Sequence, residues 1–123
     1  MKIINLKQFK KMPVGTVFAK YQPCVFNDLM VLRGHSEVES FYDFYYDSII
    51  GNVRNDSSSD FVDKCRAMEK GESCKLDFEF TGRDGCFDEN QLSAIYEKQD
   101  VIDFIYRLTD SLIDSFGIGL KDL

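Results

Sequence analysis

Apolar residues recur at intervals of three or four along three stretches of the chain, which is the spacing of one face of a helix. In the first stretch, Leu6, Phe9 and Met12 fall on one side. Asn5 can cap a helix that begins here, and Pro13 cannot continue it. The pattern therefore predicts a short N-terminal helix between these two residues.

The other two stretches predict the main helices. One opens at residues 57–60, which have the character of a capping box, and closes at Gly71. Its apolar face comprises Phe61, Val62, Cys65 and Met68. The last helix runs over residues 101–116, between a cap at Asp100 and a stop at Gly117. Its apolar stripe comprises Val101, Ile105, Leu108, Leu112 and Phe116. We expect both faces to pack on the core.

Strict alternation of apolar and charged residues makes residues 75–80 the clearest strand of the chain. The three apolar side chains point one way and the charges the other, as in a half-buried antiparallel strand. Residues 81–92 are expected to connect it to a returning strand over residues 92–97. Within this connection, residues 83–85 have turn chemistry, in which Gly85 would supply a positive φ.

Strand formers also dominate residues 15–21. Residues 27–28 are Asn and Asp, which tolerate positive φ, so they favour a tight hairpin between residues 24–26 and residues 29–32. Residues 34–36, Gly-His-Ser, are expected to end that hairpin.

The aromatic segment at residues 41–47 fits a strand through Tyr42, Phe44 and Tyr46, and fits a helix nearly as well. Its aromatic enrichment favours the strand. Together the elements predict an α+β fold, with a small, mostly antiparallel sheet of four to five strands, two main helices and a short N-terminal helix. We expect one domain over residues 1–123, because this length is typical of a single domain.

Charge is unevenly distributed in this chain. The formal net charge is −6, but residues 36–123 hold nine Lys/Arg and twenty Asp/Glu, a charge of −11. Such a surface keeps a protein soluble, and it also favours a partner with a basic surface and disfavours direct nucleic-acid binding. The chain opens without the pattern of a signal peptide and holds no apolar run of the length a membrane span needs, so we expect a cytoplasmic protein.

Candidate chemistry is sparse. The four cysteines form no C-x-x-C pair, and His35 is the only histidine, so a zinc site is not expected. His35 looks like part of a loop, and no phosphate-binding motif is present. Asp84, Asp88 and Glu89 do not match a calcium loop, although Asp84 and Asp88 leave a magnesium site open. We therefore expect a protein that is not an enzyme and needs no cofactor.

The aromatic segment has five aromatics in six residues, more than one buried strand face can hold. Either both faces are buried, or tyrosines reach the surface and contact a partner or a second copy in a homodimer. The expected partner-binding residues are Tyr42, Asp43, Tyr45, Tyr46, Asp47, Asp84, Asp88 and Glu89.

Three sequence stretches resemble small acidic accessory proteins of bacteriophages and prophages. They are Met12-Pro13-Val14-Gly15-Thr16, Pro23 to Phe26, and Gly82 to Asp88 with the residues that follow. The resemblance spans roughly residues 5–108. It implies a phage gene that acts in the bacterial cytoplasm, a group that includes inhibitors of host defence such as anti-CRISPR proteins. It transfers no functional residue.

Three functions follow as hypotheses. The first is a non-enzymatic inhibitor that binds a host defence protein through an acidic, tyrosine-rich surface. The second is a sponge for a nucleotide defence signal, in which aromatics stack on the base and Arg33, Arg54 or Arg83 holds phosphate. The third is a metal-assisted enzyme that uses the acidic residues of the 81–92 segment.

Overall fold

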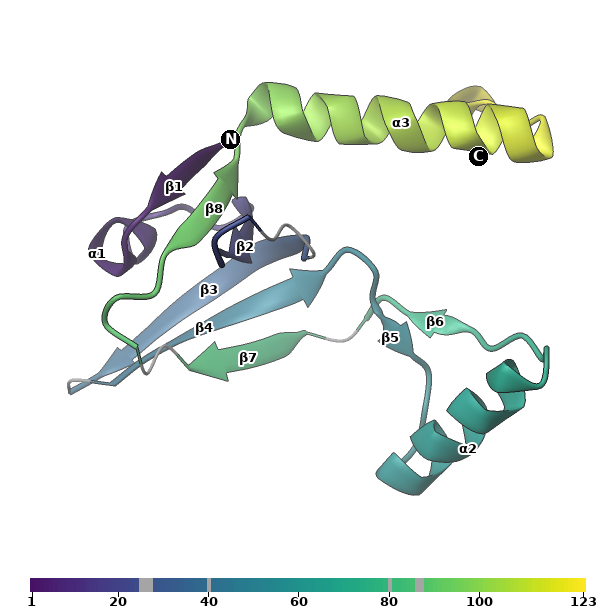
Figure 1. Ribbon diagram of the computed structural model, residues 1–123, viewed down its shortest axis with the longest axis horizontal. Helices are drawn as coiled ribbons and strands as arrows, with labels where there is room; N and C mark the ends of the chain where they lie inside the picture. The colour runs from purple at the N-terminus through teal and green to yellow at the C-terminus, as the bar shows by residue number, and fades with distance from the viewer. Residues whose placement is uncertain (25–27, 40, 80, 86–87) are drawn as a thin grey trace.

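The computed structural model describes residues 1–24, 28–39, 41–79, 81–85 and 88–123 (Figure 1). Six antiparallel strands form the main sheet, in the order β1-β8-β2-β3-β4-β7, and β5 and β6 form a separate two-stranded sheet. The elements are β1 (Lys2–Ile4), α1 (Leu6–Phe9), β2 (Val17–Lys20), β3 (Met30–Val38), β4 (Phe41–Ser48), β5 (Asn52–Val53), α2 (Ser58–Glu69), β6 (Leu76–Asp77), β7 (Gly82–Gly85), β8 (Ser93–Tyr96), α3 (Lys98–Phe116) and a final 3-10 turn (Leu120–Asp122). The α+β class is confirmed, and the main sheet has more strands than the four to five predicted.

The core lies on one face of the main sheet, where α1 covers it. Phe9 of α1, Phe18 of β2 and Phe44 of β4 are fully buried against one another, with ring centroids 4.9–5.5 Å apart. Leu32 of β3 is buried beside them. Burial of a phenylalanine or leucine side chain contributes about 1.5–3 kcal/mol, so this cluster is a principal source of stability.

The predicted N-terminal helix is confirmed, in a shortened form. The Asn5 side chain accepts a hydrogen bond from the Gln8 backbone N–H at 2.9 Å, and Gln8 accepts one from the Asn5 N–H at 3.1 Å. This capping box fixes the start of α1. The helix ends at Phe9, and Met12 packs on the core from the turn that follows.

The aromatic segment is a strand, because β4 pairs along its length with β3. The predicted hairpin end at residues 34–36 is wrong, since these residues lie in the middle of β3. A register shift between Leu32 and Gly34 breaks the alternation there, which explains why the sequence reads as interrupted. Most of the hairpin predicted around residues 27–28 falls on residues 25–27, outside the described residues.

The predicted pairing of residues 75–80 with residues 92–97 is also wrong. In the described part of the first segment only β6 is a strand, and it pairs with β5, whereas β8 pairs with β1 and β2. Residues 83–85 are not a turn: they belong to β7, the edge strand beside β4. Gly85 pairs with Asp43 in the ladder, so it lies in the strand and not in the turn that was predicted. Phe80 lies outside the described residues.

Two parts of the chain extend away from the main sheet (Figure 1). One, which we call the arm, comprises residues 49–79, with β5, α2 and β6. The other is α3. Neither α2 nor α3 contains a buried residue, so the prediction that their apolar faces pack on the core is wrong. Helical spacing shows that one face is apolar, and it does not show what covers that face. The predicted stops are confirmed, because Gly71 and Gly117 follow the two helices with φ of +96° and +67°.

Candidate functional site

The two faces of β4 divide the predicted site residues. Tyr42 and Phe44 are buried in the core, and Tyr46 packs against it. The residues between them, Asp43 and Tyr45, lie on the opposite face, because successive side chains of a strand alternate. The expectation that the tyrosines share one exposed surface is therefore corrected: of the three in β4, only Tyr45 lies on the face opposite the core. We call this the polar face and define it by Arg33, Asp43, Tyr45, Asp47, Thr81 and Arg83.

Arg83 and Asp43 form the first ion pair of the polar face. The Arg83 guanidinium donates to Oδ2 of Asp43 through Nε at 2.6 Å and also contacts that oxygen through Nη2. Asp43 is buried while Arg83 is mostly exposed, so the arginine covers a carboxylate that needs a partner. The same guanidinium lies 5.6 Å from the ring centroid of Tyr45, its cross-strand neighbour.

Asp47 is the centre of the second cluster. Its Oδ2 accepts a hydrogen bond from Nε of Arg33 at 2.6 Å, and its Oδ1 accepts one from the hydroxyl of Thr81 at 2.8 Å. These two donors hold the pKa of the Asp47 carboxyl below its usual value of 3.8. Thr81 follows the arm along the chain, so Asp47 fastens the returning end of the arm to β4.

Asp84, Asp88 and Glu89, the acidic residues of the predicted 81–92 connection, do not form one site. Asp84 is on β7 opposite Phe44, and its Oδ2 lies 2.6 Å from the Lys20 ammonium. Asp88 and Glu89 belong to the connection between β7 and β8, where Asp88 accepts a hydrogen bond from the Asn90 backbone N–H at 2.9 Å. Among the residues that the structure describes, no three His, Cys, Asp or Glu side chains gather as a metal site would require.

His35 has a structural position that the sequence did not indicate. Nε2 lies 2.8 Å from the carbonyl oxygen of Met12, which can only accept, so this nitrogen carries the proton. In the neutral imidazole, Nδ1 then accepts a hydrogen bond from the Tyr42 hydroxyl. The imidazole joins the segment after α1 to β3 and β4, so the prediction of a loop histidine is wrong. His35 lies in β3, and the register shift between Leu32 and Gly34 interrupts the alternation by which this strand could be predicted from the sequence.

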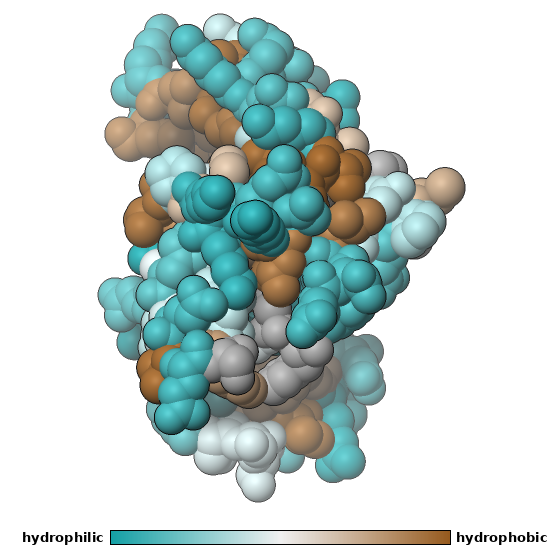
Figure 2. All heavy atoms as spheres, turned by 90° about the vertical axis from the view of Figure 1, so that its left-hand side faces the viewer, coloured by the Kyte–Doolittle hydropathy of each residue, from teal (hydrophilic) through white to brown (hydrophobic). Residues whose placement is uncertain are grey.

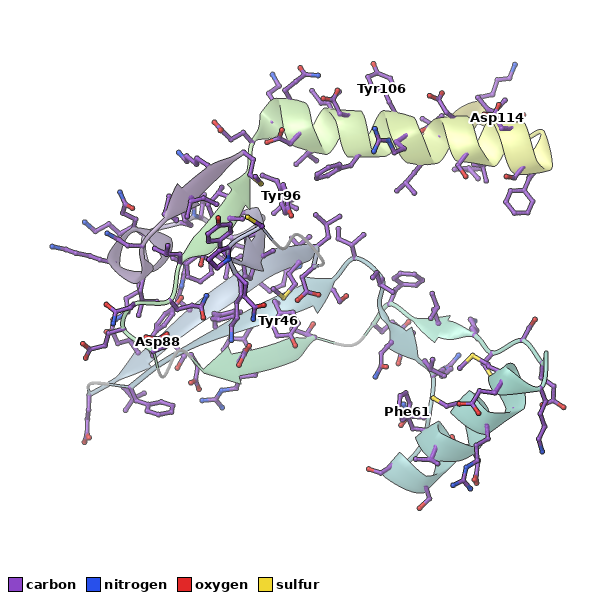
Figure 3. The ribbon with its side chains drawn as sticks, viewed as in Figure 1. Tyr46, Phe61, Asp88, Tyr96, Tyr106 and Asp114 are labelled. Atoms are coloured by element: carbon purple, nitrogen blue, oxygen red, sulfur yellow. The ribbon has the colours of Figure 1, made fainter. Side chains whose placement is uncertain are left out.

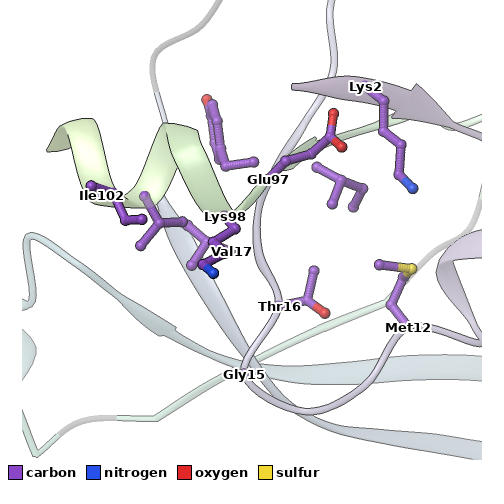
Figure 4. Close-up of a pocket in the computed structure, with 11 residues that line it drawn as sticks. Lys2, Met12, Gly15, Thr16, Val17, Glu97, Lys98 and Ile102 are labelled. Atoms are coloured by element: carbon purple, nitrogen blue, oxygen red, sulfur yellow. The ribbon is translucent and has the colours of Figure 1, made fainter.

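A cavity of about 490 Å³ lies where α3 leaves the sheet (Figure 4). Lys98 and Ile102 of α3 line one side, and Lys2 and Met12 line the other. Its floor and walls are largely apolar, with the charged side chains of Lys2, Glu97 and Lys98 among its lining. Its residues come from three separate segments of the chain, at residues 2, 12–17 and 95–102, so no local motif could have indicated it.

Comparison with family models, with curated proteins and with solved structures gives no match. No helix among the described residues has the length and apolar character needed to cross a bilayer. The view in Figure 2 shows hydrophilic side chains over much of one side of the molecule, interrupted by hydrophobic patches.

Proposed function

We propose that this chain is a non-enzymatic accessory protein of a bacteriophage, which binds and inhibits a defence protein in the cytoplasm of its bacterial host. The observation that supports a binding role most directly is the apolar surface of the arm. Ile50 and Phe78 are each 65% exposed, and Phe61 and Val62 of α2 are exposed beside polar neighbours. Large apolar side chains that gather outside the core are typical of interaction surfaces.

The polar face supports the arm in this role. Asp47 and Thr81 join the arm's end to β4, and Tyr45 lies on the same strand face between the two ion pairs. Tyrosine and arginine are enriched among residues that dominate binding energies. The proposed contact surface therefore runs from Tyr45 and Arg83 to the exposed phenylalanines of the arm.

Charge would guide this association. Asp43 and Asp47 are each paired with an arginine, so the local charge of the polar face is balanced. The net charge of −11 over residues 36–123 therefore comes almost entirely from acidic residues outside these two ion pairs. It would attract a basic partner from a distance. Association should then weaken as salt screens this attraction.

The test is capture of a host protein and inhibition of that same protein. We expect tagged wild-type protein to retain one basic protein from bacterial lysate at low salt and to release it at high salt. Phe78→Ser should abolish capture, and Tyr106→Ser, an equally exposed aromatic on α3, should retain it. Purified target should lose its activity at a fixed ratio of the two proteins. Complete inhibition by a small fraction of an equivalent would indicate catalysis and would contradict the proposal.

A second candidate is the nucleotide sponge, which one observation favours. Arg33 and Arg83 lie on the same strand face as Tyr45, so an aromatic ring and two guanidinium groups are available together. A base could stack on Tyr45 while phosphate oxygens replace the carboxylates of Asp43 and Asp47. A cyclic nucleotide that raises Tm of the wild type, and not of Arg83→Gln, would support the sponge. No shift with any cyclic nucleotide would count against it.

A further inference from the structure

Among the described residues, the ring and ion-pair contacts that join α3 to the sheet and the N-terminus lie in the first part of the helix. The ring of Phe104 contacts that of Tyr96 on β8, with centroids 5.2 Å apart. The Met1 amine lies 2.6 Å from Oδ2 of Asp100. Beyond this first part, Leu108 is 65% and Phe116 71% exposed. A helix of nineteen residues is about 28 Å long, so most of its length extends past its anchors.

One side of α3 is apolar along the helix. Val101, Ile105, Leu108 and Leu112 follow one another at alternating intervals of four and three, the spacing of a seam between two paired helices. A groove of about 440 Å³ lies along this seam, lined by Ile105, Leu108, Leu112, Phe116, Leu120 and Leu123 among others. Figure 3 shows Tyr106 and Asp114 on the side of α3 that points away from the sheet.

The molecule exposes more surface than a protein of its mass usually does. Its accessible surface is 9090 Å², whereas a monomer of 14.2 kDa is expected to expose about 6,800 Å². The excess is about 2,300 Å² for each chain and is shared between α3 and the arm. Two chains together have about 4,600 Å² of excess surface, so part of it suffices for the roughly 2,000 Å² or more that an obligate homodimer buries. Two copies that cover α3 and its surroundings would therefore bring the exposed surface towards the ordinary range.

The charges on α3 are compatible with a second copy as the occupant. With 100° between successive residues, Asp100, Asp103, Arg107, Asp110 and Asp114 all lie about 110° or more from the centre of the seam. The residues beside the seam, such as Phe104, Thr109 and Ser111, carry no charge. Two acidic chains can thus bring these helices together without placing carboxylates opposite each other.

Lys98 decides the orientation. It is the one charged residue of α3 close to the line of the seam, and it lies at the start of the helix. A parallel pair would place two Lys98 ammonium groups together, whereas an antiparallel pair places each beside the other helix's C-terminal end, where partial negative charge accumulates. The two helix dipoles then also oppose each other.

We infer that α3 is a dimerisation element, and that two copies of this chain pair their α3 helices antiparallel, about an axis near Leu108. Ile105 of one copy then lies at the level of Leu112 of the partner subunit. Phe116 of each copy lies at the level of Val101 of the other, beside the cavity at the base of α3. The cavity and the groove are parts of one interface.

The first experiment is the mass in solution by sedimentation equilibrium. We expect wild type to have twice the chain mass of 14.2 kDa. Leu108→Asp places two carboxylates at the axis and should halve the mass. Tyr106→Asp is the matched control, because Tyr106 is 64% exposed on the other side of α3, and it should remain dimeric.

A monomeric wild type at high micromolar concentration would overturn the inference, and so would equal masses for the two aspartate variants. Circular dichroism checks that Leu108→Asp keeps its fold. We expect that it does, because Leu108 is 65% exposed and is not part of the core cluster. If that variant is unstable, Leu108→Ser serves instead and should raise the dimer dissociation constant at least several-fold.

Cross-linking tests the orientation. In a variant whose four cysteines are replaced by serine, Leu108→Cys should form a disulfide-linked dimer on oxidation, because this residue lies close to its own copy at the axis. Val101→Cys should not, since antiparallel pairing separates the two copies of this residue. Efficient linkage through position 101 would establish the parallel arrangement and contradict the proposed one. These outcomes are independent of whether a host protein is bound.

Discussion

Phenylalanines of the main sheet and those of the extended parts have opposite environments. Phe18 and Phe44 are at most 1% exposed, whereas Phe78 of the arm and Phe116 at the end of α3 are more than half exposed. Both pairs of phenylalanines belong to sequence patterns from which burial in a core is predicted. The difference is that β2 and β4 have neighbouring strands and α1 to cover them, while no described element covers the arm or the end of α3.

This contrast separates the part of the molecule with a buried core from the parts whose apolar side chains stay exposed in a single chain. The aromatic cluster around Phe9 gives the sheet a core of its own. In the arm and α3, backbone hydrogen bonds and end caps are present, but neither α2 nor α3 has a buried residue. Since packing of an apolar face supplies most of the stability of helices in proteins, these two helices have little of that support within one chain. Such surfaces are retained where binding needs them.

The largest expected effect compares the two environments directly. Phe18→Ala removes a fully buried ring and should lower the free energy of unfolding by about 3–5 kcal/mol. Phe116→Ala should change it by less than about 0.5 kcal/mol in the monomeric Leu108→Asp background, as is usual for exposed positions. Urea unfolding followed by circular dichroism measures both. Similar losses would show that α3 packs on the core.

A smaller effect is expected where β7 meets β4. A Cβ at Gly82 would lie 2.6 Å from Cζ of Tyr46, so Gly82→Ala forces the ring to move and should cost about 1–3 kcal/mol. The matched control is Gly34→Ala, whose Cβ would lie at an ordinary 3.6 Å from Tyr45. The Tm of Gly82→Ala should be clearly lower than that of Gly34→Ala. Equal Tm values would mean that β7 and Tyr46 accommodate the added Cβ without cost.

The smallest effect concerns the Asp47 cluster at the root of the arm. Arg33 and Thr81 lower the pKa of Asp47 from 3.8, so its contribution to stability is present above that value and is lost as the pH falls through the lowered pKa. Asp47→Asn should therefore be less stable than wild type at pH 7, by up to about 1 kcal/mol, and the difference should vanish under strongly acidic conditions.

The control for this pH series is Asp110→Asn on the outer side of α3. Tm measured from neutral pH down to pH values well below 3.8 should show a gap for Asp47→Asn that narrows as the carboxyl of wild type is protonated. A gap of constant size would show that the substitution acts through packing and not through the charge of Asp47.

Parts of the fold set by local chemistry were predictable. The capping box at Asn5, the stops at Gly71 and Gly117 and the aromatic strand all appear where their residues indicated. The last helix begins at Lys98, earlier than predicted, because Asp100 accepts a hydrogen bond from the Glu97 backbone N–H instead of capping from outside. The α+β class followed from the order of these elements.

Pairing partners and burial were not predictable, because both depend on distant residues. Leu76 and Phe78 alternate with charges as a half-buried strand does, yet Phe78 faces away from the core. Residues 83–85 have turn chemistry, and pairing with β4 nevertheless holds them extended. In the predicted site, strand alternation alone separates Tyr42 from Tyr45, but only the structure shows which of the two lies in the core.

The arm leaves the sheet after β4 and returns at β7, and these two strands are antiparallel neighbours. Tyr46 pairs with Gly82, so the entry and exit points are close enough for a hairpin loop of about two to five residues to join them. A short turn in place of the arm would therefore leave β4 and β7 paired as they are. An engineer could graft another segment at these two ends while the aromatic core and α3 remain as they are.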